Sequence, residues 1–373
     1  MEDWLEKHRF SARFNAGESG HTAQSLKNLL EGLQPDFEFD LRESLWEIML
    51  NDAPNMGLEE LREEVAELHP GATAEQVLIT TGTSEAIFLL LRQLAPKKVA
   101  LVVPAFQLLI EVPRLIGASI IPLALEWSAG GEPKAPIESW CEVLRQQQPN
   151  VLILNNPHNP SGLTFKKEEM NYLLATAEEL GCLIIGDEHY RFLADSGSLL
   201  GPTSYAPGRF VTGSFIKCTG TPGLRIGWCV GDGRLMRSLQ SEKNYLTHTV
   251  NPISQQLALW FLQSLKRRQT FFRPLHQAWV DHRSYLSAWF NTQSFWTGVS
   301  PAGGLVTCVF PTQAIPSDDL LERLQLHGLF MLPLTTFVDS SFVGDERFFR
   351  GFRLGLGLQT KKFKELLSVM GSF

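Results

Sequence analysis

Short apolar runs of strand length recur along the first 230 residues of this 373-residue chain, separated by segments of helical character. Runs that are apolar at almost every position are typical of strands buried on both faces, which occur in parallel sheets covered by helices. The sequence therefore predicts an α/β fold with a mostly parallel sheet. The predicted strands are Val77–Thr81, Val99–Val103, Val151–Leu154, Leu183–Gly186, Phe210–Gly213 and Ile226–Val230.

The pattern changes after about residue 265. Segments 300–310 and 328–337 have strand character, whereas segments 317–326 and 360–369 have helical periodicity. A smaller α+β domain is therefore expected in the last third of the chain.

Net charge and cysteine content exclude several kinds of partner and site. The net charge is −7 and the basic residues are scattered, so we expect no nucleic-acid partner and no anionic-membrane partner. The five cysteines are dispersed without a C-x-x-C pair, which favours a reducing compartment without disulfides or a zinc site. Because the N-terminus is charged and no apolar run reaches membrane length, we expect a cytoplasmic protein.

Four residues lie just after predicted strands, within five residues of the strand end: Phe106, Asn159, Asp187 and Lys217. In open α/β sheets, ligands bind at the carboxyl ends of the strands. These side chains are therefore expected to share one site.

The segment around Lys217 indicates the chemistry of that site. It has the sequence GSFIKCTGTPGLRIGW, in which glycines and Ser214 flank the lysine and Arg225 follows eight residues later. This arrangement suits an aldehyde cofactor with a phosphate group, because Lys217 can bond to the aldehyde while Ser214 and Arg225 bind the phosphate. Residues 82–84, at the start of a predicted helix, would add backbone amides and the helix dipole.

Taken in order, these motifs resemble those of the fold-type-I pyridoxal-phosphate (PLP) enzymes, the aspartate aminotransferase superfamily. The strings TTGTSEA, NNPHNPSG, IIGDEHY and the Lys217 segment carry the resemblance, which covers roughly residues 50–360. It implies PLP as the cofactor and a homodimer whose active sites take residues from both subunits. It also implies a large domain at 35–262 and a discontinuous small domain at 1–34 and 263–373.

The resemblance assigns a role to each motif residue. Lys217 bonds to PLP and moves substrate protons, and Asp187 faces the pyridine nitrogen and keeps the ring protonated. Asn159 and Tyr190 would hydrogen-bond the ring hydroxyl, and Phe106 would stack on the ring. The expected catalytic residues are Lys217, Asp187 and Tyr190. The expected cofactor-binding residues are Gly82, Thr83, Ser84, Phe106, Asn159, Asp187, Tyr190, Ser214, Lys217 and Arg225.

The substrate side matches the superfamily at one position and departs from it at another. Arg353 matches the C-terminal arginine that clamps a substrate α-carboxylate, which implies an α-amino acid substrate. In aminotransferases a tyrosine lies five residues before the glycine that corresponds to Gly57 of this chain. That tyrosine reaches the cofactor phosphate in the neighbouring subunit. This chain has Asp52 instead. A phosphate would repel a carboxylate, so Asp52 is expected to face a cationic substrate or to turn to solvent.

A narrower resemblance is to PLP-dependent cyclodehydratases of hydroxylated arginine, the group of capreomycidine synthase and of the enduracididine-forming enzyme of guanitoxin biosynthesis. The strings EDWLEKHRF and PGLRIGWCV and residues 245–247 carry it. It implies a guanidino amino acid substrate, a role in natural-product or toxin biosynthesis, and closure of either a five-membered ring from γ-hydroxy-L-arginine or a six-membered ring from β-hydroxyarginine. A carboxylate or histidine should accept the guanidinium proton. The candidates for this role and for substrate binding, together with Arg353 and Asn159, are Asp52, Glu18, His21 and His248.

Three other activities fit the same scaffold. An aminotransferase of a basic amino acid would need a keto acid as second substrate, and an arginine oxidase would need oxygen. A PLP-fold regulator without catalysis would normally be fused to a DNA-binding segment or lack the lysine, whereas this chain has Lys217.

Overall fold

The computed structural model describes residues 1, 5–6, 12–194, 208–339 and 345–373. Within these ranges seven strands form a central sheet. Its neighbouring pairs are parallel except those made by one strand, β10, which runs antiparallel to both its neighbours. The predicted mostly parallel α/β sheet is therefore confirmed. In spatial order the strands are β2 (Val77–Thr80), β10 (Gly227–Val230), β9 (Arg209–Gly213), β8 (Leu183–Glu188), β7 (Val151–Asn155), β3 (Lys98–Val103) and β4 (Ser119–Ala124).

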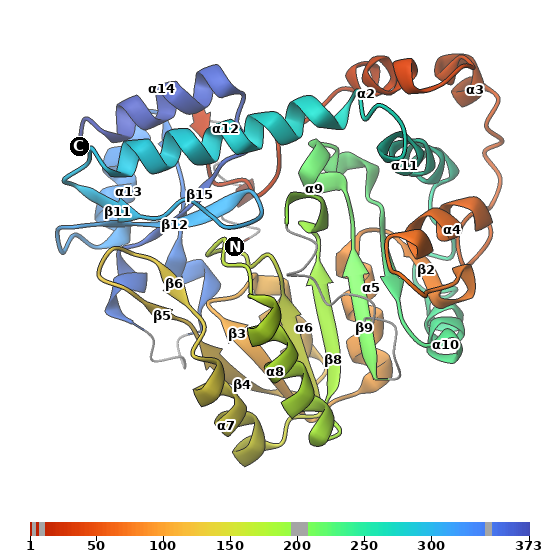
Figure 1. Cartoon of the computed structure of the whole chain (residues 1–373), viewed down its shortest axis with the longest axis horizontal. Helices are drawn as coiled ribbons and strands as arrows, with labels where there is room; N and C mark the ends of the chain where they lie inside the picture. The colour runs from red at the N-terminus through yellow and green to blue at the C-terminus, as the bar shows by residue number, and fades with distance from the viewer. Residues whose placement is uncertain (2–4, 7–11, 195–207, 340–344) are drawn as a thin grey trace.

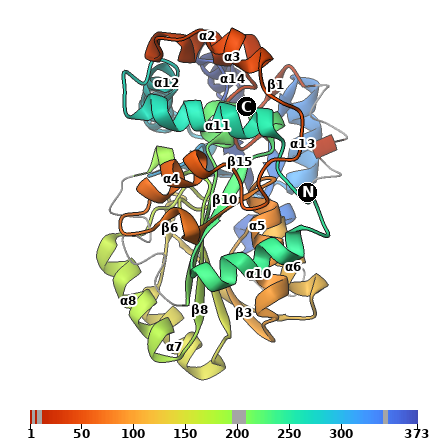
Figure 2. The same ribbon diagram turned by 90° about the vertical axis from the view of Figure 1, so that its right-hand side faces the viewer.

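Helices cover both faces of this sheet (Figure 1, Figure 2). In β7 every residue is buried: Leu152 and Leu154 pack into the core on one face, and Val151 and Ile153 pack into the core on the other. Because side chains alternate between the faces of a strand, a strand covered on both sides has to be apolar throughout. One face is covered by α7 (Ile137–Gln147) and α8 (Lys167–Glu179), and the other by α5 (Thr83–Leu94), α6 (Gln107–Leu115) and α10 (Gly233–Lys243).

A second, antiparallel sheet forms in the C-terminal third of the chain (Figure 1). Its strands are, in spatial order, β11 (Trp296–Gly298), β12 (Val306–Pro311), β15 (Phe352–Gly355) and β14 (Leu332–Pro333). The associated helices are α12 (Phe272–Phe290), α13 (Ser317–Leu326) and α14 (Thr360–Met370), of which α13 and α14 match the helices predicted at 317–326 and 360–369. Strand β1 (Phe14–Asn15) pairs in parallel with β13 (Leu329–Phe330), so the start of the chain lies beside its C-terminal third.

The remaining elements lie around these two sheets. Helix α4 (Glu59–Glu67) lies on the surface, with Leu61 and Val65 buried and Glu59 and Glu60 exposed. In the described residues, no helix is both long and apolar enough to cross a membrane. The elements around the two sheets are α2 (Leu26–Leu33), α3 (Leu41–Trp46), α4 (Glu59–Glu67), α9 (Ile216–Thr219), α11 (Pro252–Leu265) and the hairpin of β5 (Glu126–Trp127) and β6 (Pro133–Lys134).

Residues 16–24, which we call the N-terminal strap, are hydrogen-bonded to both parts of the fold. The Thr22 amide donates to the Gly357 carbonyl at 2.7 Å, beside the small sheet, and the Gln24 amide donates to the Gly220 carbonyl at 2.7 Å, beside the large one. A β carbon at Gly357 would overlap the backbone of the strap. The close approach of the strap therefore requires glycine at this position.

We expect Gly357→Ala to lower the free energy of unfolding by about 2 kcal/mol, because the added methyl has to displace backbone atoms. Gly223→Ala is the matched control, since a β carbon there meets no atom within 4 Å and should change stability by less than about 0.5 kcal/mol. Urea unfolding of both variants measures the difference. Equal unfolding midpoints would contradict the tight packing of the strap.

Candidate active site

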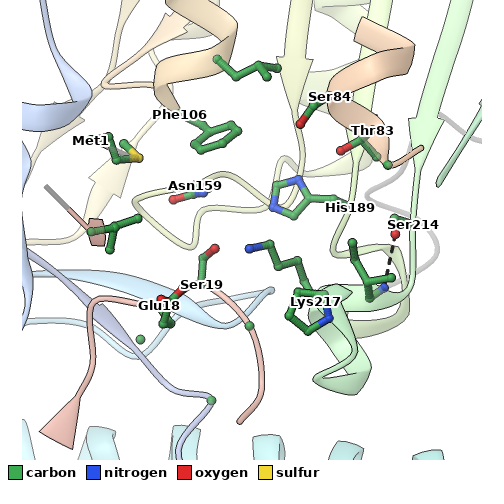
Figure 3. A pocket seen from close by; sticks show the side chains of 18 of the residues that line it. Met1, Glu18, Ser19, Thr83, Ser84, Phe106, Asn159, His189, Ser214 and Lys217 are labelled. Carbon is green, nitrogen blue, oxygen red and sulfur yellow. Dashed lines mark hydrogen bonds between the residues drawn. The ribbon is translucent and has the colours of Figure 1, made fainter. Parts of the chain in front are cut away.

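A cavity of about 940 Å³ opens where β7, β8 and β9 end (Figure 3). It is bounded by residues from both parts of the fold and by the N-terminal strap. All but three of the site residues predicted from the sequence line it. The predicted residues that line the cavity are Glu18, His21, Gly82, Thr83, Ser84, Phe106, Asn159, Asp187, Ser214, Lys217, Arg225 and Arg353.

One end of the cavity is suited to bind a phosphate. Helix α5 begins there after Gly82, whose φ of +84° favours glycine, and the helix presents the amides of its first turn and its positive dipole end. A β carbon at Gly82 would lie 2.9 Å from Arg225 Nη2, so the glycine also makes room for the guanidinium. Ser214 lies at the same end as Thr83 (Figure 3). Its Oγ donates to the Ile226 carbonyl at 2.7 Å, and the hydroxyl would have to rotate to donate to a phosphate oxygen.

Lys217 belongs to the short helix α9, and its amine extends into the middle of the cavity, toward Asn159 (Figure 3). Its backbone is fixed by the strap, because the His21 amide donates to the Lys217 carbonyl at 3.0 Å. Phe106 lies across the cavity from the lysine (Figure 3). A planar ring placed between them would contact an aromatic face and lie within reach of the amine.

Asp187 lies at the end of β8 among donors from both neighbouring strands. Asn155 Nδ2 donates to Asp187 Oδ2 at 3.0 Å, and Thr212 Oγ1 donates to Asp187 Oδ1 at 3.1 Å. Asn155 and Thr212 are also its register partners on β7 and β9. These two donors fix the orientation of the carboxylate, which lines the cavity.

Arg353, in β15, supplies a buried positive charge on the small-sheet side of the cavity. Its Nη1 donates to Asn159 Oδ1 at 3.0 Å, and its Nη2 donates to the Gly17 carbonyl of the strap. Its guanidinium also lies 5.0 Å from the centre of the Phe337 ring. These contacts orient the planar fork that a carboxylate can bind with two hydrogen bonds.

Glu18 and His21 enter the cavity from the strap. Burial, together with the nearby His282 ring, lowers the pKa of His21 to about 4. His21 Nε2 is buried and has no hydrogen-bond partner among the described residues. At neutral pH His21 is therefore an uncharged imidazole on the cavity wall.

The lowered pKa of His21 predicts acid sensitivity. An unfolded chain binds the proton near pH 6.5 and the folded chain only near pH 4, so stability is fully present above pH 6.5 and is lost as the pH falls toward 4. This residue alone should account for about 3 kcal/mol. We expect His21→Asn to flatten the fall in unfolding free energy between pH 6.5 and 4, measured by urea denaturation. An unchanged pH slope would contradict a buried neutral His21.

Three predicted residues do not line the cavity of their own chain. Tyr190 is fully buried, and its hydroxyl donates to the Ser19 carbonyl at 2.5 Å, so it supports the strap from beneath. Burial raises the pKa of this phenol, which keeps it protonated. Asp52 and His248 are exposed on the surface of the chain.

The sequence interpretation did not identify Asn155, Thr212 and His189 as partners of Asp187. His189 lines the cavity, and its Nδ1 lies 3.1 Å from Asp187 Oδ2. The spacing was a usable signal, because residues two apart at a strand end face the same side. Asn155 and Thr212 follow from the register of neighbouring parallel strands, which the sequence does not give.

The chain matches a known protein family over most of its length. The model of the family "Aminotransferase class I and II" matches residues 49–367. Capreomycidine synthase of Streptomyces vinaceus is 28% identical over 344 residues, which span 89% of this chain and 85% of that protein. A histidinol-phosphate aminotransferase of Desulfitobacterium hafniense (strain Y51) is 29% identical over 213 residues, which span 56% of this chain and 57% of that protein.

Two solved structures share the fold over the whole chain. A PLP-dependent aminotransferase from Streptococcus suis 89-1591 has a TM-score of 0.85 at 22% identity, covering 100% of this chain and 96% of that one. The PLP-dependent cyclase OrfR has a TM-score of 0.84 at 22% identity, covering 100% of this chain and 95% of that one.

The residues around the cavity fit pyridoxal 5'-phosphate, which is the cofactor of this family. The glycine-lined cup beside Arg225 suits its phosphate, the amine of Lys217 suits its aldehyde, and the carboxylate of Asp187 suits its ring nitrogen. The chain therefore belongs to the class I and II aminotransferase family of fold-type-I PLP-dependent enzymes.

Proposed function

We propose that this protein is a PLP-dependent cyclodehydratase of a hydroxylated L-arginine, acting on γ-hydroxy-L-arginine to give L-enduracididine in natural-product or toxin biosynthesis. The similarity to capreomycidine synthase along 89% of the chain supports the reaction class. The observation that carries the proposal is the position of Glu18, an acidic side chain in the cavity that also holds Lys217 (Figure 3). Arg353 lines the same cavity.

The reaction balances without an oxidant or a second substrate. The γ-carbon loses its hydroxyl group, a guanidine nitrogen loses a proton, these leave together as water, and a carbon–nitrogen bond closes a five-membered ring. When bound, PLP supplies the electron withdrawal that makes the carbons next to the amino group acidic. Lys217 moves the α-proton, and Arg353 holds the α-carboxylate.

The guanidine needs a proton acceptor, because freeing its nitrogen lone pair at neutral pH would cost about 8 kcal/mol. Glu18 suits this task better than His21. A carboxylate attracts a guanidinium and accepts two of its N–H groups. His21, whose pKa is about 4, is uncharged at neutral pH and carries no attracting charge. In this proposal Glu18 binds the guanidinium and takes its proton as the ring closes.

The proposal is tested by incubating the PLP-loaded protein with γ-hydroxy-L-arginine, without a keto acid, and analysing the products by mass spectrometry. We expect catalytic loss of one water with the amino group retained, and a five-membered ring by NMR. A six-membered ring from β-hydroxyarginine alone would make it a capreomycidine-type enzyme. Turnover only after 2-oxoglutarate or pyruvate is added would overturn the proposal in favour of an aminotransferase of a basic amino acid.

We also propose that the enzyme is a homodimer with shared active sites. Asn55 Nδ2 donates to Asn244 Oδ1 at 2.9 Å, which joins the segment that carries Asp52 to the turn that carries His248. Large apolar side chains around these segments are exposed, which is typical of a surface that a partner covers. They are Trp46, Met49, Leu50, Tyr245 and Leu246, with exposed fractions of 55–94%.

In such a dimer Asp52 would face the cationic substrate of the partner's site. We then expect Asp52→Asn to weaken binding of the guanidino substrate about tenfold, because one charge-assisted hydrogen bond is lost. Glu322→Gln, another exposed acid, is the control. Unchanged affinity in Asp52→Asn would reject the cation site, and a molecular mass near 41.8 kDa by light scattering would reject the dimer.

A further inference from the structure

We propose that His189 is a positioning residue for Asp187: its Nδ1–H donates to Asp187 Oδ2 and holds that carboxylate where it meets the ring nitrogen of the cofactor. His189 Nδ1 lies 3.1 Å from Asp187 Oδ2, and the histidine is 7% exposed. Both residues line the cavity. The inference rests on the family's cofactor and is independent of the proposed substrate.

The contacts of Asp187 determine which nitrogen of His189 carries the proton. Asp187 Oδ2 also accepts from Asn155 Nδ2 at 3.0 Å, and an ionised carboxylate oxygen can only accept. Asn155 Nδ2 lies 3.3 Å from His189 Nδ1, as expected when two donors converge on one oxygen. His189 Nδ1 is therefore assigned the hydrogen that it donates to Asp187 Oδ2.

Two further contacts hold His189, one to its ring and one to its backbone. It packs on the Tyr190 ring with 4.1 Å between the ring centres and a tilt of 49°. Its backbone carbonyl accepts from Cys218 Sγ at 3.7 Å, one residue after the catalytic lysine. Figure 3 shows the His189 ring facing the same space as the amine of Lys217. Because His189 is fixed in this way, its Nδ1 donor restricts the position of Asp187 Oδ2.

This arrangement gives Asp187 donors on both oxygens, Thr212 on Oδ1 and the pair of Asn155 and His189 on Oδ2. Each donor restricts the rotation of the carboxylate. Loss of the His189 donor would leave Oδ2 with a single side-chain donor. The expected result is a weaker and less well oriented contact with the cofactor ring nitrogen.

Three substitutions separate positioning from simple filling of space. The amide nitrogen of Asn can occupy the place of Nδ1, whereas that of Gln reaches the place of Nε2. We expect His189→Asn to keep the dissociation constant for PLP within about threefold of the parent, and His189→Gln and His189→Ala to raise it about tenfold or more. The constants are measured by fluorescence titration of the cofactor-free protein with PLP, and the pH midpoint of the bound cofactor's absorption is recorded in parallel.

The outcomes discriminate between the roles. Rescue by Asn of both the affinity and the absorption midpoint, with Gln and Ala shifted, supports the proposal. Rescue by Gln alone would mean that His189 acts through Nε2 and would overturn it. Equal effects of Asn, Gln and Ala, or no effect of any of them, would also overturn it, because the Nδ1 contact would then contribute nothing specific. Thermal unfolding of the cofactor-free variants reports any general loss of folding separately.

Discussion

Lys217→Ala is expected to reduce turnover by about 10⁴-fold or more, because in the proposed function Lys217 is both the amine that bonds to PLP and the group that moves the substrate proton. The side chain enters the middle of the cavity from α9, and its backbone carbonyl is held by the strap at His21. No other lysine lines the cavity in the described part of the chain. A neighbouring amine is therefore not available to take over its role.

Borohydride reduction followed by mass spectrometry measures the covalent role without requiring a substrate. The parent protein should gain the mass of one reduced cofactor on the peptide that contains Lys217, and Lys217→Ala should gain none. The variant should still bind PLP without a covalent bond, because Arg225 and the start of α5 remain. Lys361→Ala, at an exposed position in α14, is the control. It should gain one reduced cofactor on the peptide that contains Lys217, as the parent does. Labelling of Lys217→Ala at another lysine would contradict the assignment.

The sequence was sufficient for the fold class because its two strongest signals are local, but it missed the edge strand β4, and Leu334–Phe337, in the segment predicted as a strand, form a 3-10 helix. Runs such as Val151–Leu154 are apolar throughout and of strand length, as a strand buried on both faces requires. Asp187 and Lys217 follow such runs, and parallel strands bring their carboxyl ends to one edge. Spacing along the chain therefore translated directly into proximity at the cavity.

Other features depend on information that the sequence does not contain. Tyr190 follows Asp187 by three residues, but its side chain turns beneath the strap to reach the Ser19 carbonyl, while that of His189 faces the cavity. Which of two adjacent side chains enters a cavity depends on how the chain turns after the strand ends. Asp52 and His248 lie on the surface of one chain, and their role depends on a second copy. Sequence spacing within one chain cannot describe such a contact.

The recognition of the substrate carboxylate leads to a second large expected effect. Arg353 is 2% exposed and lines the cavity with its fork oriented by Asn159 and by the Gly17 carbonyl. Two charge-assisted hydrogen bonds to a carboxylate contribute about 3–4 kcal/mol. Arg353→Gln should therefore weaken binding of an α-amino acid by about 10²- to 10³-fold. Arg353→Lys keeps the charge but loses the planar fork, so an intermediate loss is expected.

Because Arg353 also holds the strap and Asn159, the loss must be assigned to the carboxylate and not to a disturbed cavity. L-Arginine and agmatine, which lacks the carboxylate, provide this comparison. Their dissociation constants are measured from the change in absorbance of the bound cofactor. If Arg353 binds the carboxylate, Arg353→Gln strongly weakens the binding of L-arginine but weakens the binding of agmatine by less than about threefold. This difference is what a double-mutant cycle requires of a direct contact between Arg353 and the carboxylate. Equal weakening of both ligands would show that the arginine acts only by supporting the strap, and the carboxylate would then have to be bound elsewhere in the cavity.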